Sequence, residues 1–237
     1  MPTPIAPGKH AMPLSVGGEL ARAVHFDVSP YCTRVAIAGS VRRGKPIVGD
    51  VELVCISKPG QPVLPSQGQV GMFDSEIVAE APADDQLTAY LRDRVEDPTS
   101  PWALRPNVAG VTSFGPVNKY MTYDGAPVDI FTAYLMTFGM VFFVRTGDAE
   151  WIVRAMAEFK RQGSHAHPYG GVEVTVDGDV TAEVLDPARW AQAELLCPTE
   201  ETVFELLGWP FVEPEDRTGA KALELRDPAG PSPRRVQ

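Results

Sequence analysis

The stretch of sequence that decides the fold reads Val35-Ala-Ile-Ala-Gly-Ser-Val-Arg-Arg-Gly-Lys-Pro-Ile-Val-Gly-Asp-Val-Glu-Leu-Val-Cys-Ile56. An apolar run leads into Gly39-Ser40, a basic loop follows, and Gly49 opens a second apolar run that carries Asp50 and Glu52. Residues two apart on a strand point to the same face, so this pattern places the two carboxylates side by side. Adjacent like charges repel each other unless a cation lies between them, and hard cations such as Mg2+ take oxygen ligands. The pattern therefore predicts a metal site on the second strand.

The turn before the second strand predicts a phosphate-binding site. Gly39 has no side chain, so backbone N–H groups and the hydroxyl of Ser40 are open to an anion. Arg42 and Arg43 add positive charge that suits phosphate oxygens. A phosphate-binding turn beside metal-binding carboxylates is the arrangement of groups that nucleotidyl transfer requires. The plainer alternative is an ordinary β-hairpin with a solvated charged end, which a lone Gly-Ser pair or a lone Asp-x-Glu would indicate.

This stretch resembles the family X DNA polymerases, the polymerase beta-like nucleotidyltransferases. In that family a Gly-Ser-x-Arg-Arg-Gly block precedes a Gly-Asp-x-Asp strand, and the spacing from Gly39 to Asp50 fits without a gap. Glu52 stands where the family usually has Asp, which keeps the carboxylate but adds a methylene. The resemblance implies a triphosphate cradle made of Gly39, Ser40, Arg43 and Gly49.

A second pair of strands supplies a third carboxylate. Apolar runs at 117–123 and 126–132 flank Asp124-Gly125, which is a strong signal for a two-residue hairpin turn. Asp129 lies inside the second run, where a charge is costly unless it is paired or bound to a metal. The resemblance implies that Asp129 is the third metal carboxylate. Family members often place an Arg two residues before it, whereas this chain has Pro127.

The C-terminal part of the resemblance begins at Thr146-Gly147. In the family, a Thr-Gly at this place borders the sugar and base of the incoming nucleotide at the start of a helix. Apolar residues at helical intervals predict that helix over 149–161, and a capped apolar stripe predicts another over 198–208. The run from Trp209 to Arg217 resembles the closing segment of the family, with its Glu-Pro-x-x-Arg signature.

Weaker patterns predict the remaining elements. We expect helices over 18–25 and 84–95, with Asp84 or Asp85 as the cap of the second helix. We expect residues 97–107 to form an irregular connection in which Trp102 is a buried hydrophobic side chain. We expect residues 170–184 to form a hairpin that turns at residues 177–178. His165 and His167 would share a face of a strand and could bind a metal; the alternative is a loop that happens to contain histidines.

Composition limits the classes of function. The chain has 237 residues, 44% of them hydrophobic and 22% charged, and no apolar run approaches the ~20 residues of a membrane span. Three scattered cysteines form neither a metal motif nor a disulfide framework, and the start of the chain lacks a signal-peptide core, so we expect a cytoplasmic protein. The net charge of −10 argues against tight, sequence-blind DNA binding, although a local basic groove is compatible with it.

The expected architecture is an α/β (α+β) protein in four parts. Residues 1–14 form a flexible arm, 15–140 a nucleotidyltransferase palm with a mixed β-sheet, 141–219 a small α/β thumb, and 220–237 a disordered tail. The resemblance covers palm and thumb only, because the residues before Leu20 are too few for lyase and fingers domains. The smallest, viral members of the family have this pared-down layout.

The resemblance implies a monomeric DNA polymerase that adds nucleotides from dNTPs to the 3′-OH of a DNA primer or gap, as in DNA repair. Asp50, Glu52 and Asp129 would hold two Mg2+ ions, for which Mn2+ can substitute. The cationic side chains expected near DNA are Arg42, Lys45, Lys119, Arg154 and Lys160. Two alternatives remain: nucleotidyl transfer to a protein, an RNA or a small molecule, which the acidic charge favours, and a catalytically idle module that binds nucleotide or DNA.

Overall fold

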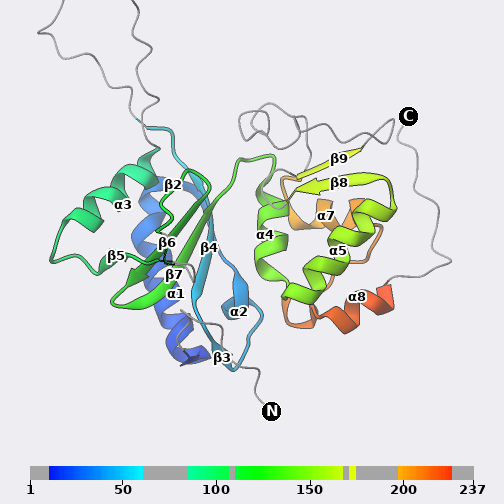
Figure 1. Cartoon of the computed structure of the whole chain (residues 1–237), viewed down its shortest axis with the longest axis horizontal. Helices are drawn as coiled ribbons and strands as arrows, with labels where there is room; N and C mark the ends of the chain where they lie inside the picture. The colour runs from blue at the N-terminus through cyan, green and yellow to red at the C-terminus, as the bar shows by residue number, and fades with distance from the viewer. Residues whose placement is uncertain are drawn as a thin grey trace, which may run out of the picture.

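A computed structural model describes residues 11–60, 85–106, 110, 112–167, 171–174 and 197–225. These residues form two lobes that lie side by side, one built on a β-sheet and one mainly helical (Figure 1). Helix α4 (Phe138–Thr146) lies between the sheet and the rest of the C-terminal lobe. No helix among the described residues is both long enough and apolar enough to cross a membrane.

The N-terminal lobe contains a five-stranded mixed sheet in the order β2-β4-β7-β6-β5. The strands are β2 (Cys32–Ile37), β4 (Val51–Ser57), β5 (Trp102–Leu104), β6 (Asn118–Tyr123) and β7 (Ala126–Thr132). β4 and β7 are parallel, and every other pair is antiparallel. The predicted hairpin is confirmed: Asp124 and Gly125 have φ values of 49° and 77°, which a two-residue hairpin turn of this type requires.

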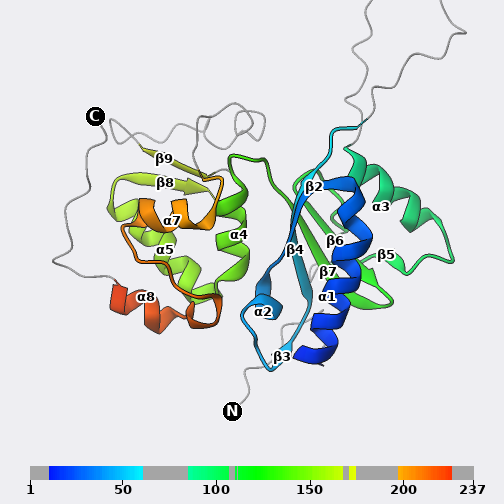
Figure 2. The same ribbon diagram turned by 180° about the vertical axis from the view of Figure 1, so that it is seen from behind.

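Both faces of this sheet are covered, as Figure 2 shows from behind. Helices α1 (Leu14–Val28) and α3 (Gln86–Glu96) cover one face, where their apolar side chains pack on Leu53 of β4 and Ile130 of β7. The other face packs on α4, through a cluster that joins Val54 and Phe131 to the helix. Because side chains alternate along a strand, odd positions of β4 face α1 and even positions face α4.

The segment between β2 and β4 is held by the N-terminal residues. After the single-turn helix α2 (Gly39–Arg42), strand β3 (Ile47–Val48) pairs with β1 (Met12–Pro13), and α1 starts at Leu14. The predicted flexible arm at 1–14 is therefore wrong for its last residues, and the predicted helix at 18–25 is longer at both ends. Gly17 packs so closely that a Cβ there would lie 2.3 Å from Cγ2 of Val48.

The C-terminal lobe is a helical cluster with a hairpin at one side. It contains α4, α5 (Ala149–Arg161), α7 (Glu200–Leu207), α8 (Gly219–Leu225) and the strands β8 (Ser164–His167) and β9 (Gly171–Val174). Its core is aromatic: Trp151 lies edge-on to Trp209 at 5.3 Å and Phe143 edge-on to Phe204 at 5.2 Å, measured between ring centroids. The helix predicted over 149–161 is confirmed, with Asp148 as its cap.

Several predicted boundaries differ from the structure. The connection at 97–107 contains β5, whose Trp102 is buried as expected but also donates its indole N–H to Asp27 at 2.7 Å. Residues 220–225, predicted as part of a disordered tail, belong to α8, and residues 226–237 lie outside the described residues. The strand at 171–174 pairs with β8, whereas the hairpin turn predicted at 177–178 lies outside the described residues. The predicted lobe boundary at residue 140 falls within α4, which packs into both lobes.

Candidate active site

Two of the three predicted carboxylates occupy neighbouring positions on the central strands. β4 and β7 run parallel in a register that pairs Glu52 with Asp129, so both side chains point to the face covered by α4. Asp50, 2% exposed, lies immediately before β4, and Asp129 is 8% exposed. The fold thus brings the predicted carboxylates to one end of adjacent strands.

The glycine turn lies directly against this carboxylate pair. Gly39 has φ +64°, and a Cβ at this position would lie 1.9 Å from Oε2 of Glu52. The amide of Ala38 donates to the carbonyl of Glu52 at 2.8 Å, which fixes the turn on β4. Both the left-handed backbone and the close approach require glycine here.

The cradle next to the carboxylates contains polar groups available to a ligand. Ser40 Oγ and Arg43 Nε are buried and have no hydrogen-bond partner among the described residues. Burial lowers the pKa of Arg43, while the nearby carboxylates of Glu52, Asp148 and Asp50 act in the opposite direction. An arginine keeps its charge under such conditions. A buried hydroxyl and a buried cation side by side suit the oxygens of a phosphate.

The end of α4 binds both arginines of the basic loop. Arg43 donates to the carbonyls of Thr146 and Gly147 at 2.6 and 3.1 Å. Arg42 donates to the hydroxyl of Thr146 at 2.7 Å and, through both terminal nitrogens, to Glu200 at 2.7 Å each. The predicted nucleotide-bordering residues Thr146 and Gly147 therefore lie beside the predicted cradle, although their polar groups bond to the arginines.

One site residue was not predicted from the sequence. Arg105, just after β5, donates from Nη2 to Oδ1 of Asp129 and forms a salt bridge with it. Its Nε also points to the carbonyl of Met121 at 3.4 Å. Arg105 lies in no motif, and its contact depends on the strand order β7-β6-β5, so the sequence pattern carried no signal for it. It supplies a cation to Asp129 in a chain that has Pro127 at the position of the family arginine.

The residues fit a divalent cation in chemical type. Carboxylate oxygens are the ligands that Mg2+ prefers, and Glu52 and Asp129 share a face in direct register. Among the described residues, no group of three or more His, Cys, Asp or Glu side chains is arranged round one point as in a metal site. Arg105 holds Asp129, and Arg43 lies within electrostatic reach of Asp50 and Glu52. Rotation of the carboxylates away from these arginines would be needed to bring them onto one ion.

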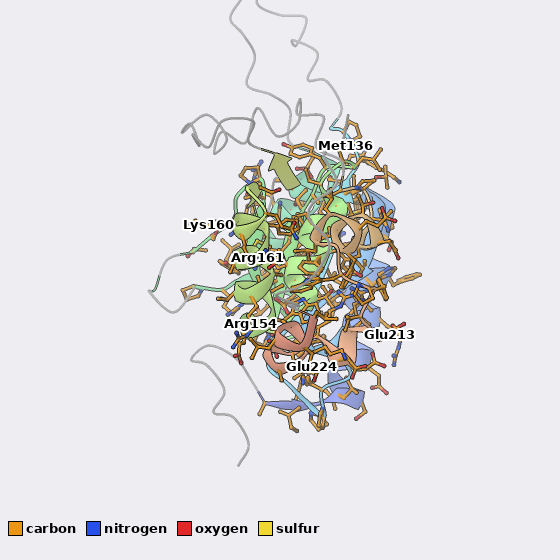
Figure 3. The ribbon with its side chains drawn as sticks, turned by 90° about the vertical axis from the view of Figure 1, so that its right-hand side faces the viewer. Met136, Arg154, Lys160, Arg161, Glu213 and Glu224 are labelled. Atoms are coloured by element: carbon orange, nitrogen blue, oxygen red, sulfur yellow. The ribbon has the colours of Figure 1, made fainter. Side chains whose placement is uncertain are left out.

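The cations predicted to contact DNA lie in different surroundings. Lys119 is completely buried and donates from Nζ to the carbonyl of Gly115 at 3.1 Å. The next residue, Tyr120, pairs with Asp129, so Lys119 points to the opposite face of the sheet from the carboxylates. This placement contradicts the predicted contact of Lys119 with DNA. Arg154 and Lys160 lie with Arg161 along one side of the C-terminal lobe (Figure 3), and Lys45 lies half-buried in the loop after α2.

The fold is the polymerase beta-like fold that the sequence motifs predicted, a mixed sheet followed by a helical lobe. Among the solved structures that match is a ternary P/T complex of polymerase beta from Leishmania infantum. It matches with a TM-score of 0.55 and 18% sequence identity, over 88% of this chain and 77% of that one. No model of a protein family and no curated protein matches the sequence.

Proposed function

We propose that this protein is a metal-dependent nucleotidyltransferase that adds nucleotides from dNTPs to the 3′-OH of DNA. The observation that carries the proposal is the in-register pair of Glu52 and Asp129, with the Gly39 turn packed against it. A charged pair on two adjacent central strands is costly for folding, and a ligand of opposite charge explains why it is kept. The Leishmania infantum polymerase beta with this fold, captured as a ternary P/T complex, supports DNA as the acceptor.

The residues of the cradle would bind and orient the triphosphate. Ser40 Oγ, which is buried without a hydrogen-bond partner among the described residues, would donate to a phosphate oxygen, and Arg43 would turn its guanidinium from the carbonyl oxygens at the end of α4 toward the phosphates. Asp50, Glu52 and Asp129 would hold Mg2+ or Mn2+. When bound, such ions lower the pKa of an attacking hydroxyl and stabilise the leaving pyrophosphate. Asp129 would accept the proton of the 3′-OH once it is released from Arg105.

Primer extension tests the proposal directly. A labelled primer, with and without a template strand, is offered dNTPs or NTPs in Mg2+ or Mn2+. We expect extension that requires the metal and that falls at least a hundredfold in Asp129→Asn, a change that keeps the size of the side chain. Metal-dependent binding of nucleotide without turnover on any acceptor would instead identify a catalytically idle module.

Nucleotidyl transfer to a protein, an RNA or a small molecule is the second candidate. The specific observation that favours it is the loss of expected DNA contacts: Lys119 is buried, and Arg42 is engaged by Glu200. The net charge of −10 also favours an acceptor other than DNA, because it repels the phosphates of a DNA backbone. Incubation with α-labelled NTPs in a mixture of protein and RNA acceptors distinguishes the two, because label would then appear in an acceptor other than the DNA primer.

A further inference from the structure

The salt bridge between Arg105 and Asp129 joins the edge of the sheet to its centre. Arg105 follows β5, the edge strand, and reaches over β6 to Asp129 on β7. Its backbone amide donates to the carbonyl of Tyr120 at 3.0 Å, and its guanidinium carbon lies 5.8 Å from the centroid of the Tyr120 ring. Tyr120 pairs with Asp129, so their side chains lie next to each other on the same face of the sheet. The guanidinium of Arg105 therefore passes Tyr120 and reaches the carboxylate of Asp129.

The surroundings make this contact stronger than a surface ion pair. The side chain of Arg105 is 16% exposed and that of Asp129 is 11% exposed, so water screens the two charges only partly. Charge-assisted hydrogen bonds are stronger than neutral ones, and the Nε contact with Met121 limits the rotation of the guanidinium. Arg105 therefore fixes the direction in which Asp129 points.

We propose that Arg105 is a positioning residue that holds Asp129 in the metal-free protein, and that a divalent cation binds Asp129 by exchange with Arg105. This inference rests on the metal site of the proposed function. The cation and the guanidinium would both be drawn to the same small carboxylate, and two positive groups at that distance repel each other.

Direct measurement of Mn2+ binding, by calorimetry and by the spin resonance of the free ion, tests the exchange without nucleotide or DNA. We expect Arg105→Gln to tighten Mn2+ binding by about tenfold, which corresponds to one charge-assisted hydrogen bond that no longer has to be broken. Arg105→Lys keeps the charge but loses the planar fork, so its affinity should lie between those of the wild type and Arg105→Gln. This second variant also carries the test if Arg105→Gln does not fold.

Two controls identify the site. Arg94→Gln makes the same change in net charge on α3, where Arg94 lies 3.9 Å from Asp97 and both side chains are well exposed. Its Mn2+ affinity should equal that of the wild type. Asp129→Asn should weaken Mn2+ binding by at least tenfold. Mn2+ should also raise the Tm of Arg105→Gln more than that of the wild type, because the ion replaces the missing counter-charge.

Three results would overturn the inference. They are Mn2+ binding by Arg105→Gln that is no tighter than by Arg94→Gln, Mn2+ binding that Asp129→Asn leaves unchanged, and no Mn2+ binding by wild type or by Arg105→Gln. Failure of the proposed reaction is a separate outcome. If Arg105→Gln binds Mn2+ more tightly but no acceptor is extended, the exchange stands and the proposed reaction falls.

Discussion

Gly39 is the residue at which the proposed phosphate turn packs against Glu52, one of the carboxylates proposed to bind metal. An alanine here would have to adopt a left-handed φ of +64° and place its Cβ 1.9 Å from Oε2 of Glu52. The backbone strain costs about 1–2 kcal/mol, and displacement of the carboxylate adds about 1–3 kcal/mol. We therefore expect Gly39→Ala to lower the free energy of unfolding by roughly 3 kcal/mol in urea denaturation and to abolish turnover.

Gly44 offers a matched control in the same loop. Its φ is +63°, but no atom lies within 4 Å of the position of a Cβ, so Gly44→Ala carries the backbone strain alone. Its loss of stability should be about 1–2 kcal/mol, with turnover retained. Equal losses of stability in the two variants would show that Glu52 does not lie against Gly39.

The structure bears differently on the predicted carboxylates and on the predicted cations. Strand periodicity and apolar context singled out Asp50, Glu52 and Asp129 because both act on near neighbours in the chain, and the fold sets Glu52 and Asp129 in register on one face. Their role as metal ligands stays a prediction. Arg105 was missed because its contact crosses two strand pairings. Lys119 was expected near DNA, but it is buried and points away from the carboxylates, because its neighbour Tyr120 is the residue that pairs with Asp129.

Helix α7 is anchored at its first turn by a buried carboxylate between two arginines. Glu200 accepts from Arg42 at 2.7 Å and from Arg217 at 2.5 Å, and Arg217 is completely buried. Removal of one partner from such a group leaves buried charge uncompensated, which costs about 3–5 kcal/mol. Glu200→Gln should therefore lower the free energy of unfolding by about 3 kcal/mol at neutral pH, measured by urea denaturation. Glu205→Gln, at an exposed position of the same helix, should change it by less than about 0.5 kcal/mol.

The effect of Glu200→Gln should depend on pH in a defined direction. Burial opposes ionisation of Glu200, but hydrogen bonds from Arg42 and Arg217 outweigh it and hold the pKa of Glu200 below its ordinary value of 4.5. A lowered pKa in the folded state adds stability that is fully present above the unfolded-state pKa and is lost as pH falls through the folded-state pKa. The difference between wild type and Glu200→Gln should thus be largest at neutral pH and shrink below about pH 4. A difference that stayed constant across this range would contradict an ionised Glu200.

At the scale of elements, local sequence signals predicted whether a segment is a helix or a strand better than they predicted its first and last residues. The helix over 149–161 was predicted with its bounds because its apolar residues recur at helical intervals, and the structure adds Asp148 as its cap. Strand β5 and helix α8 are short, and their stability comes from pairing with β6 and packing on α5, which no local pattern reveals. The signature that ends at Arg217 was recognised as sequence, but its role in holding α7 became visible only in the fold.

The two lobes are joined by side chains in and beside the proposed phosphate-binding turn. Besides the bonds of Arg42 and Arg43 to the C-terminal lobe, Arg34 of β2 donates to the carbonyl of Pro198 at 3.3 Å and lies 3.8 Å from the centroid of the Phe138 ring. The end of α4 thus couples the position of the C-terminal lobe to the predicted triphosphate cradle. Release of Arg43 to a phosphate would remove two of these bonds, so we infer that nucleotide binding and the relative position of the lobes are linked.

The charge distribution of the whole molecule predicts weak, salt-sensitive binding to DNA. The net charge is −10, Lys119 is buried and Arg42 is bound to Glu200, which leaves Lys45 and Lys160 of the predicted cations at accessible positions, together with Arg154, which is paired with Glu150. Neutralisation of about two or three phosphates gives a slope of about −2 to −3 for log K against log salt concentration, or a loss of about 15- to 60-fold between about 50 and about 200 mM salt. Fluorescence anisotropy of a labelled primer–template measures this slope.

Lys160→Gln should make the salt slope shallower by about one. Lys221→Gln, which makes the same charge change at a residue paired with Glu224, should leave the slope unaltered. Nanomolar binding that barely responds to salt would contradict the prediction, and so would equal slopes for Lys160→Gln and the wild type.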